Sequence, residues 1–260
     1  AYSARKSNRG RIEGIISEHS RARDRPLVGI SCYTRPVRIL GLESSSRRGS
    51  LALVEDGRLV STLEHEEPNS HAERLLPLLE RLLAEAGWPK SSLDRLGVGV
   101  GPGSFTGLRA GIALGEGLSV GLDRPLLGIG SLLAMAHGAL SERPGPCCAL
   151  LDAHRNEVFA AVYAESQREL RAPIAVPIED LPHFLRDSGA ITVVGEVTDR
   201  LPHGLTRVSG PQLDLPHARW VAALAAELDE ASFPPEPRYV RGIGATLPEL
   251  PRAPTSAGSR

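Results

Sequence analysis

The sequence predicts an α/β fold made of two related lobes, each with a mixed sheet and helices. Short apolar strands alternate with amphipathic helices along most of the 260 residues. A hairpin is expected at the start of each half, and a Pro/Gly-rich stretch at 142–146 separates the two halves. We therefore expect an N-terminal lobe at 38–143 and a C-terminal lobe at 144–242.

In the N-terminal lobe, strands are expected at 38–43, 50–54 and 58–64, with Asp56-Gly57 as the hairpin turn between the last two. Ser70 and Glu73 have the spacing of a capping box, which predicts the start of a Leu-rich helix ending at Gly87. The lobe is completed by a buried strand at 96–100, a helix reaching about 122, a strand at 125–129 and a helix at 131–140.

The C-terminal lobe is expected to open with hairpin strands at 147–153 and 158–164. A short helix at 179–187, a strand at 190–195 and an Ala/Leu helix at 217–231 follow. Because Pro, Ser and Gly are frequent from 233 onward, we expect 243–260 to be a disordered tail.

Basic residues gather at the N-terminus. Residues 1–38 carry nine Lys/Arg and three acids, a net charge of +6, which leaves −7 on the rest of a chain whose total is −1. The body therefore offers no obvious basic face for gripping RNA phosphates. We interpret 1–37 as a basic, disordered extension, with an organelle-targeting segment and an RNA-contacting arm as the alternatives.

The cysteines and the hydropathy exclude several classes of protein. Cys32, Cys147 and Cys148 form no disulfide framework, and adjacent cysteines lack the spacing of a zinc site. No apolar run approaches the ~20 residues that a membrane helix needs. We expect a cytoplasmic protein with reduced cysteines, no membrane association and no metal site of its own.

The stretch 101–109 reads Gly-Pro-Gly-Ser-Phe-Thr-Gly-Leu-Arg and predicts a tight turn that enters a helix, which Ser104 or Thr106 can cap. The turn is either structural or a phosphate cradle. Gly107, Gly111 and Gly115 then recur every four residues, a pattern that costs helix stability. Such a smooth stripe favours close packing, against either the chain's own sheet or the helix of a partner.

These motifs resemble the TsaB (YeaZ) family. The matching stretches are Ile-Leu-Gly-Leu-Glu-Ser-Ser at 39–45, the glycine-rich string within 99–109, Leu-Asp-Ala-His-Arg-Asn-Glu-Val-Phe at 151–159 and Arg-Tyr-Val-Arg at 238–241. The resemblance spans about 38–242. It implies the actin-like/Hsp70/sugar-kinase fold, and no catalytic residues in this chain.

The resemblance also implies partners. Proteins of this family pair with a catalytic paralogue, TsaD, in transferring a threonylcarbamoyl group to the adenosine beside the tRNA anticodon, and an ATPase, TsaE, joins the assembly. We therefore expect ATP and a metal ion on the partner subunits, tRNA contact through the complex, and a homodimer as a possible state of the chain alone.

The alternatives are enzymes of the same fold, either an ATP-using phosphotransferase or a metal-dependent peptidase-like enzyme. Glu43, Ser44 and Asp152 are the weak candidates for nucleotide contact, although the family has Asp and Thr at the first two positions. The turn at 154–157 has no glycine for closing on a phosphate. His71 is followed four residues later by Leu75, where a helical metal site would need a second histidine.

We therefore expect that the chain functions through a binding surface. We predict that it uses the helices at 70–86 and 105–121, and that it includes the residues His71, Leu75, Leu78, Leu82, Thr106, Gly107, Arg109, Ala110, Gly111, Leu114 and Gly115.

Overall fold

The computed structural model describes residues 35–67, 70–186, 189, 192–196, 205–229 and 233–240. The described residues from Pro36 onward belong to one compact unit. The predicted tail at 243–260 and residues 1–34 of the predicted extension lie outside the described residues. Among the residues described, no helix is long and apolar enough to span a membrane.

The N-terminal lobe is built on a five-stranded mixed sheet of order β3-β2-β1-β4-β5. Strand β2 pairs antiparallel with both β1 and β3, whereas β1 pairs with β4 and β4 pairs with β5 in parallel. Their bounds are β1 (Arg38–Glu43), β2 (Gly49–Glu55), β3 (Arg58–His65), β4 (Arg95–Gly101) and β5 (Leu126–Gly130).

The C-terminal lobe repeats this topology in a second sheet, β8-β7-β6-β9-β10. Two antiparallel pairings, β6–β7 and β7–β8, are followed on the other side of β6 by parallel pairings to β9 and β10. The bounds are β6 (Cys147–Asp152), β7 (Glu157–Tyr163), β8 (Glu169–Pro177), β9 (Thr192–Val194) and β10 (Thr206–Val208). The prediction of two related lobes is confirmed; their sequence division at 143/144 stays a prediction.

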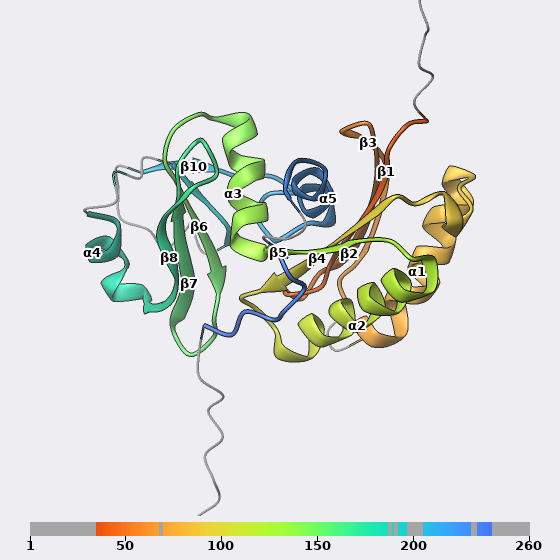
Figure 1. Ribbon diagram of the computed structural model, residues 1–260. Helices are drawn as coiled ribbons and strands as arrows, with labels where there is room; N and C mark the ends of the chain where they lie inside the picture. The colour runs from red at the N-terminus through yellow and green to blue at the C-terminus, as the bar shows by residue number, and fades with distance from the viewer. Residues whose placement is uncertain are drawn as a thin grey trace, which may run out of the picture. The chain divides into compact units, whose positions relative to one another are not determined.

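Helices connect the strands of both lobes (Figure 1). They are α1 (His71–Ala86), α2 (Phe105–Leu122), α3 (Ser131–Glu142), α4 (Leu181–Arg186) and α5 (Ala218–Glu227), with short 3-10 turns η1 (Lys90–Ser92) and η2 (Ile178–Asp180). The helix expected at 179–187 is therefore shorter and is preceded by a separate turn. Most other predicted elements are present within a few residues of their expected bounds.

In each lobe, the helix that follows the last strand packs mainly on the sheet of the other lobe. Helix α5 follows β10 in the chain but packs on β1, β2 and β4, and α3 follows β5 but packs mainly on β6 and β7. Gly97 on β4 makes room for α5, since a Cβ there would lie 2.8 Å from the Cβ of Ala225. The exchange joins the sheets through a shared interior.

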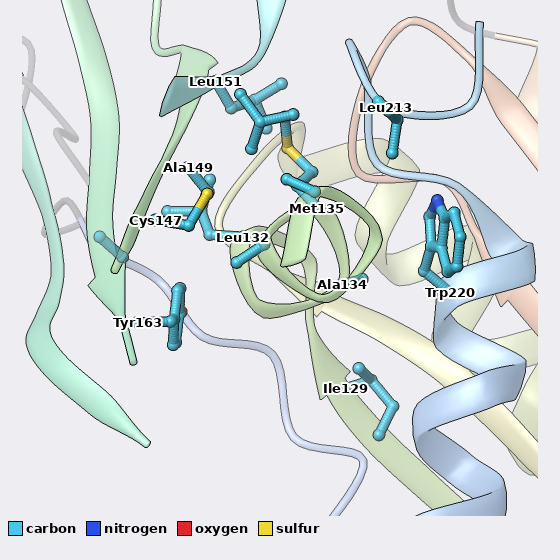
Figure 2. Close-up of a cluster of buried hydrophobic side chains, with 14 of the residues drawn as sticks. Ile129, Leu132, Ala134, Met135, Cys147, Ala149, Leu151, Tyr163, Leu213 and Trp220 are labelled. Atoms are coloured by element: carbon cyan, nitrogen blue, oxygen red, sulfur yellow. The ribbon is translucent and has the colours of Figure 1, made fainter. Parts of the chain in front are cut away.

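The largest buried cluster combines side chains of both lobes (Figure 2). Leu132 and Met135 on α3 face Cys147 and Leu151 on β6, while Trp220 on α5 closes the other side. Burial raises the pKa of Cys147 to about 12, so this thiol stays protonated and serves as a small apolar side chain.

The predicted capping box at the start of α1 is wrong. The Ser70 side chain makes no cap bond; its hydroxyl donates to the carbonyl oxygen of Glu67 at 2.8 Å. In the first turn of the helix, the N–H groups of Glu73 and Arg74 donate to the Ser70 backbone oxygen instead. The end of the helix is as predicted, with Gly87 in the left-handed conformation at φ +67°.

The glycine stripe of α2 packs against the chain's own N-terminal sheet. A Cβ on Gly107 would collide with the Ser44 carbonyl oxygen, and one on Gly111 would collide with the Ser44 hydroxyl. A Cβ on Gly115 would press on Leu126 at 3.2 Å. Gly117, in contrast, faces open space. These three glycines therefore support the alternative in which the stripe packs against the chain's own sheet.

We predict that Gly107→Ala lowers the free energy of unfolding by about 1–3 kcal/mol, because the new methyl group meets backbone that cannot rotate away. Gly117→Ala is the matched control on the same helix, and it should stabilise by up to about 1 kcal/mol through helix propensity. Urea unfolding of both variants measures the difference. Equal stability of the two variants would contradict the packing described.

Candidate functional site

The candidate site begins with Glu43, the last residue of β1. Its side chain is fully buried, and its carboxylate accepts hydrogen bonds from the Ser45 N–H at 2.6 Å and the Ser131 hydroxyl at 3.0 Å. Burial raises the pKa of Glu43, while the bonds from Ser45 and Ser131 lower it. The carboxyl group thus connects β1 to the start of α3 inside the protein.

The turn after β1 is held against the N-terminus of α2. The Ser44 hydroxyl donates to the Gly107 carbonyl oxygen at 2.8 Å, and the Ser104 N–H donates to the Ser45 carbonyl oxygen at 2.6 Å. The Ser104 hydroxyl accepts from the Gly107 N–H at 3.2 Å, so the predicted cap is confirmed. The Ser44 hydroxyl and the N–H groups of Ser104 and Gly107 are therefore bonded within the chain.

The glycine-rich turn at 101–104 is shaped by the same contact. Gly101 has φ +98°, a conformation that favours glycine. A Cβ on Gly103 would collide with the Ser45 carbonyl oxygen. The turn thus needs glycine because two backbone segments approach each other closely. This supports a structural turn, one of the two alternatives for this stretch.

His71 faces the same interior contact. Its Nε2 lies 3.0 Å from the Ser46 carbonyl oxygen and its Nδ1 lies 3.3 Å from Nε2 of His65. Burial and the neighbouring His71 lower the pKa of His65. The sequence predicts that His71 belongs to the exposed binding surface, but its side chain is buried because Ser46 and His65 surround it.

Asp152 lies apart from this cluster, at the end of β6. Its carboxylate is exposed and accepts the His154 N–H at 2.8 Å. The residues His154, Arg155 and Asn156 all have φ between +54° and +63°, which is uncommon for residues other than glycine. Asp152 thus stabilises a tight turn. Among the described residues, no hydrogen bond or ion pair joins its side chain to that of Glu43.

A link between the lobes passes close to the β1–β2 turn. Arg47 forms an ion pair with Glu196, which follows β9, and Arg48 donates to the Pro211 carbonyl oxygen. Arg48 also lies 3.4 Å from Glu64 and 3.3 Å from Glu66. These arginines stabilise the arrangement of the lobes around the turn. Within the part of the chain that is described, no group of three His, Cys, Asp or Glu side chains could hold a metal ion.

The helices predicted to form the interface lie side by side, and their residues divide into two groups. His71, Leu75, Leu82, Gly107, Gly111 and Gly115 are buried within the chain. Thr106 and Arg109 are exposed, and Leu78, Ala110 and Leu114 are half-buried. Only the second group can meet a partner without rearrangement.

An exposed aromatic cluster extends this face. The ring of Phe105 lies 5.3 Å from that of Tyr239, and the Arg109 guanidinium lies 3.8 Å from the Phe105 ring centre. Phe105 is 42% exposed and Val120, further along α2, is 85% exposed. Sequence reasoning missed this cluster, because Phe105 and Tyr239 are far apart in the chain; it also missed Ser131 and His65 as partners of Glu43 and His71.

Comparison with known proteins places these features in a family context. A sequence model described as TsaD, tRNA N6-adenosine threonylcarbamoyltransferase, matches residues 66–180. The chain is 35% identical over 134 residues to the tRNA threonylcarbamoyladenosine biosynthesis protein TsaB of Escherichia coli, covering 51% of this chain and 56% of that protein. The TsaB of Haemophilus influenzae is 36% identical over 132 residues, with 50% and 56% covered. The matches span about half the length of these curated relatives.

Solved structures extend the match to a whole protein. YeaZ from Pseudomonas aeruginosa superposes with a TM-score of 0.64 at 30% identity, covering 78% of this chain and 99% of that chain. A second structure, described as an uncharacterized protein with similarity to peptidase YEAZ from Pseudomonas aeruginosa, gives a TM-score of 0.66, also at 30% identity, with 79% and 100% covered. With the repeated sheet topology, these similarities show that the chain has the actin-like/Hsp70/sugar-kinase fold and belongs to the TsaB (YeaZ) family.

Proposed function

We propose that this chain is a non-catalytic scaffold subunit in the transfer of a threonylcarbamoyl group to the adenosine beside the tRNA anticodon. The observation that carries the non-catalytic part is the contact between Ser45 and Ser104. It engages the Ser104 N–H at the start of α2 with the chain's own backbone, whereas a phosphate site at a helix N-terminus needs N–H groups that are free to bind the ligand.

The residues proposed as weak nucleotide contacts fit this role. Glu43 is committed to Ser45 and Ser131 inside the protein, and Ser44 is committed to Gly107. Asp152 stabilises its own turn through the His154 N–H. Because none of the three combines accessibility with a neighbouring phosphate loop, no specific contact favours the phosphotransferase or the peptidase-like alternative.

The exposed parts of α1 and α2 supply the proposed docking surface. Leu78, Ala110 and Leu114 are half-buried apolar residues on the two helices, and Thr106, Arg109 and Phe105 add polar and aromatic contacts. An apolar surface on two neighbouring helices can accept a helix of a partner of related fold. The proposed partner is a TsaD-like catalytic subunit, with a TsaE-like ATPase joining the pair; ATP and the metal ion belong to these subunits, and tRNA is contacted through the complex.

The direct test is reconstitution. The chain is purified with the TsaD-like subunit and the TsaE-like ATPase of the same organism, and transfer to tRNA is measured with each subunit omitted in turn. We expect a stable heterodimer and transfer that requires this chain. Transfer at full rate without the chain, or turnover of ATP by the chain alone, would contradict the proposal.

We predict that Ala110→Arg weakens binding to the TsaD-like subunit at least about 30-fold, since it places an unpaired cation in the desolvated centre of the proposed interface. Ala172→Arg is the matched control, because Ala172 is an exposed alanine on β8 in the other lobe. Titration by calorimetry measures both. If Ala172→Arg weakened binding as much as Ala110→Arg, the docking surface would lie elsewhere; a homodimer that survives Ala110→Arg would argue against a shared surface.

We also predict that Glu43→Gln keeps transfer activity in the reconstituted complex, because the carboxyl group is structural. Its raised pKa means that the folded protein holds a proton which the unfolded chain releases above the ordinary value of 4.5. The wild-type protein should therefore lose stability relative to Glu43→Gln as pH rises from about 4.5 through the folded pKa.

Urea unfolding between pH 4 and 8 measures this difference, with Glu116→Gln, an exposed residue on α2, as the control. A stability difference that stayed constant over this pH range would show that Glu43 titrates normally.

A further inference from the structure

A pocket of about 690 Å³ opens beside the edge strand β10, away from Glu43 and from the α1–α2 surface. Its walls come from the end of α3, from β10 with the loop that follows it, and from the first turn of α5. The volume lies in the range of small-molecule sites, about 300–1,000 Å³. Neither the predicted site residues nor the matched motifs at 39–45, 101–109 and 151–159 reach it.

The pocket gathers positive charge from three distant parts of the sequence. Arg143 follows α3, Arg207 lies on β10 and Arg219 lies in the first turn of α5; Glu142 is the only acid among the described lining residues. This concentration stands out because residues 39–260 together carry a net charge of −7. Folding therefore brings these arginines together into a locally basic site that the overall composition does not reveal.

One of these arginines is held in position by its neighbours. The Arg219 guanidinium lies 4.5 Å from the Trp220 ring centre and donates to Oε1 of Gln212 at 2.9 Å. The Trp220 indole N–H in turn donates to the Gln212 carbonyl oxygen at 2.7 Å. Because Gln212 and Trp220 fix the guanidinium, less side-chain entropy is lost when it binds a ligand.

The rest of the wall combines polar residues, Thr206, Ser209 and Gln212, with an apolar side. Val208 and Leu213 line the pocket next to Trp220, and Figure 2 shows Leu213 beside the Trp220 indole. Planar guanidinium groups recognise phosphate oxygens through paired hydrogen bonds, and an apolar wall suits the flat or hydrocarbon part of the same ligand. A basic rim with an apolar wall thus fits an organic phosphate better than a simple inorganic anion.

We propose that this pocket binds a phosphate group of a nucleotide or of RNA. If the chain acts on tRNA as proposed above, a backbone phosphate of tRNA is the source that fits, and this assignment of the source rests on the proposed function. Phosphate binding itself does not rest on the proposed function, because the described residues that line the pocket all belong to this chain.

The test uses the full chain without its partners and reads binding at the pocket wall. The chain has two tryptophans, so Trp88→Phe leaves Trp220 as the sole indole reporter. Fluorescence titrations are made with pyrophosphate, ATP and the tRNA anticodon stem-loop. They compare this background with the variant Arg143→Gln/Arg219→Gln and with the control Arg168→Gln/Arg186→Gln. The control removes two exposed arginines of the C-terminal lobe that do not line the pocket.

We expect saturable Trp220 signals, with affinity at least about 10-fold lower in Arg143→Gln/Arg219→Gln and unchanged in the control. For the stem-loop, the slope of log K against log salt should also fall by about 1–2. Loss of stem-loop binding identifies RNA as the source, whereas loss of ATP and pyrophosphate binding alone identifies a free nucleotide.

No saturable signal with any of the three probes, or equal affinities in the two double variants, would overturn the proposal. Thermal melts of every variant verify folding. Because the TsaD-like subunit is absent from these titrations, their failure is distinguishable from a failure of the proposed scaffold function, which is measured by transfer to tRNA.

Discussion

The close contact between the turn after β1 and the N-terminus of α2 organises much of this structure. The Ser45 carbonyl oxygen accepts the Ser104 N–H, and the Ser44 carbonyl oxygen occupies the space that a side chain on Gly107 would fill. This contact sets the position of α2 on the sheet, and α1 packs beside α2. It therefore determines where the surface formed by the two helices lies.

The same contact supports the proposed role of the chain as a binding subunit without phosphate chemistry of its own. In a fold where loops close around a nucleotide, backbone N–H groups must stay available. Here the N–H of Ser45 binds Glu43 and the N–H of Ser104 binds Ser45, so these donors stabilise the interior. The exchange of α3 and α5 between the lobes adds a large shared core, which suits a rigid subunit that presents surfaces.

The sequence predicted what depends on local patterns. Apolar runs, the Asp56-Gly57 turn and the Gly87 helix end gave most strands and helices of both lobes near their observed bounds. It missed β8, whose mixed polar and apolar residues include Pro173, and it missed the three-residue edge strand β10. The stripe at 107–115 predicted close packing but not which surface it meets. The pocket at Arg143, Arg207 and Arg219 required the fold, since its residues have no shared sequence motif.

We propose that this chain works through the α1–α2 surface and that its turns at 43–46 and 152–157 bind no nucleotide. Hydrogen exchange of the backbone amides, measured for the chain alone, with ATP and with the TsaD-like subunit, separates this role from nucleotide binding. We expect that the partner slows exchange on the exposed sides of α1 and α2, and that ATP leaves exchange in the two turns unchanged. Protection of these two turns by ATP alone, with none on the helices from the partner, would contradict it.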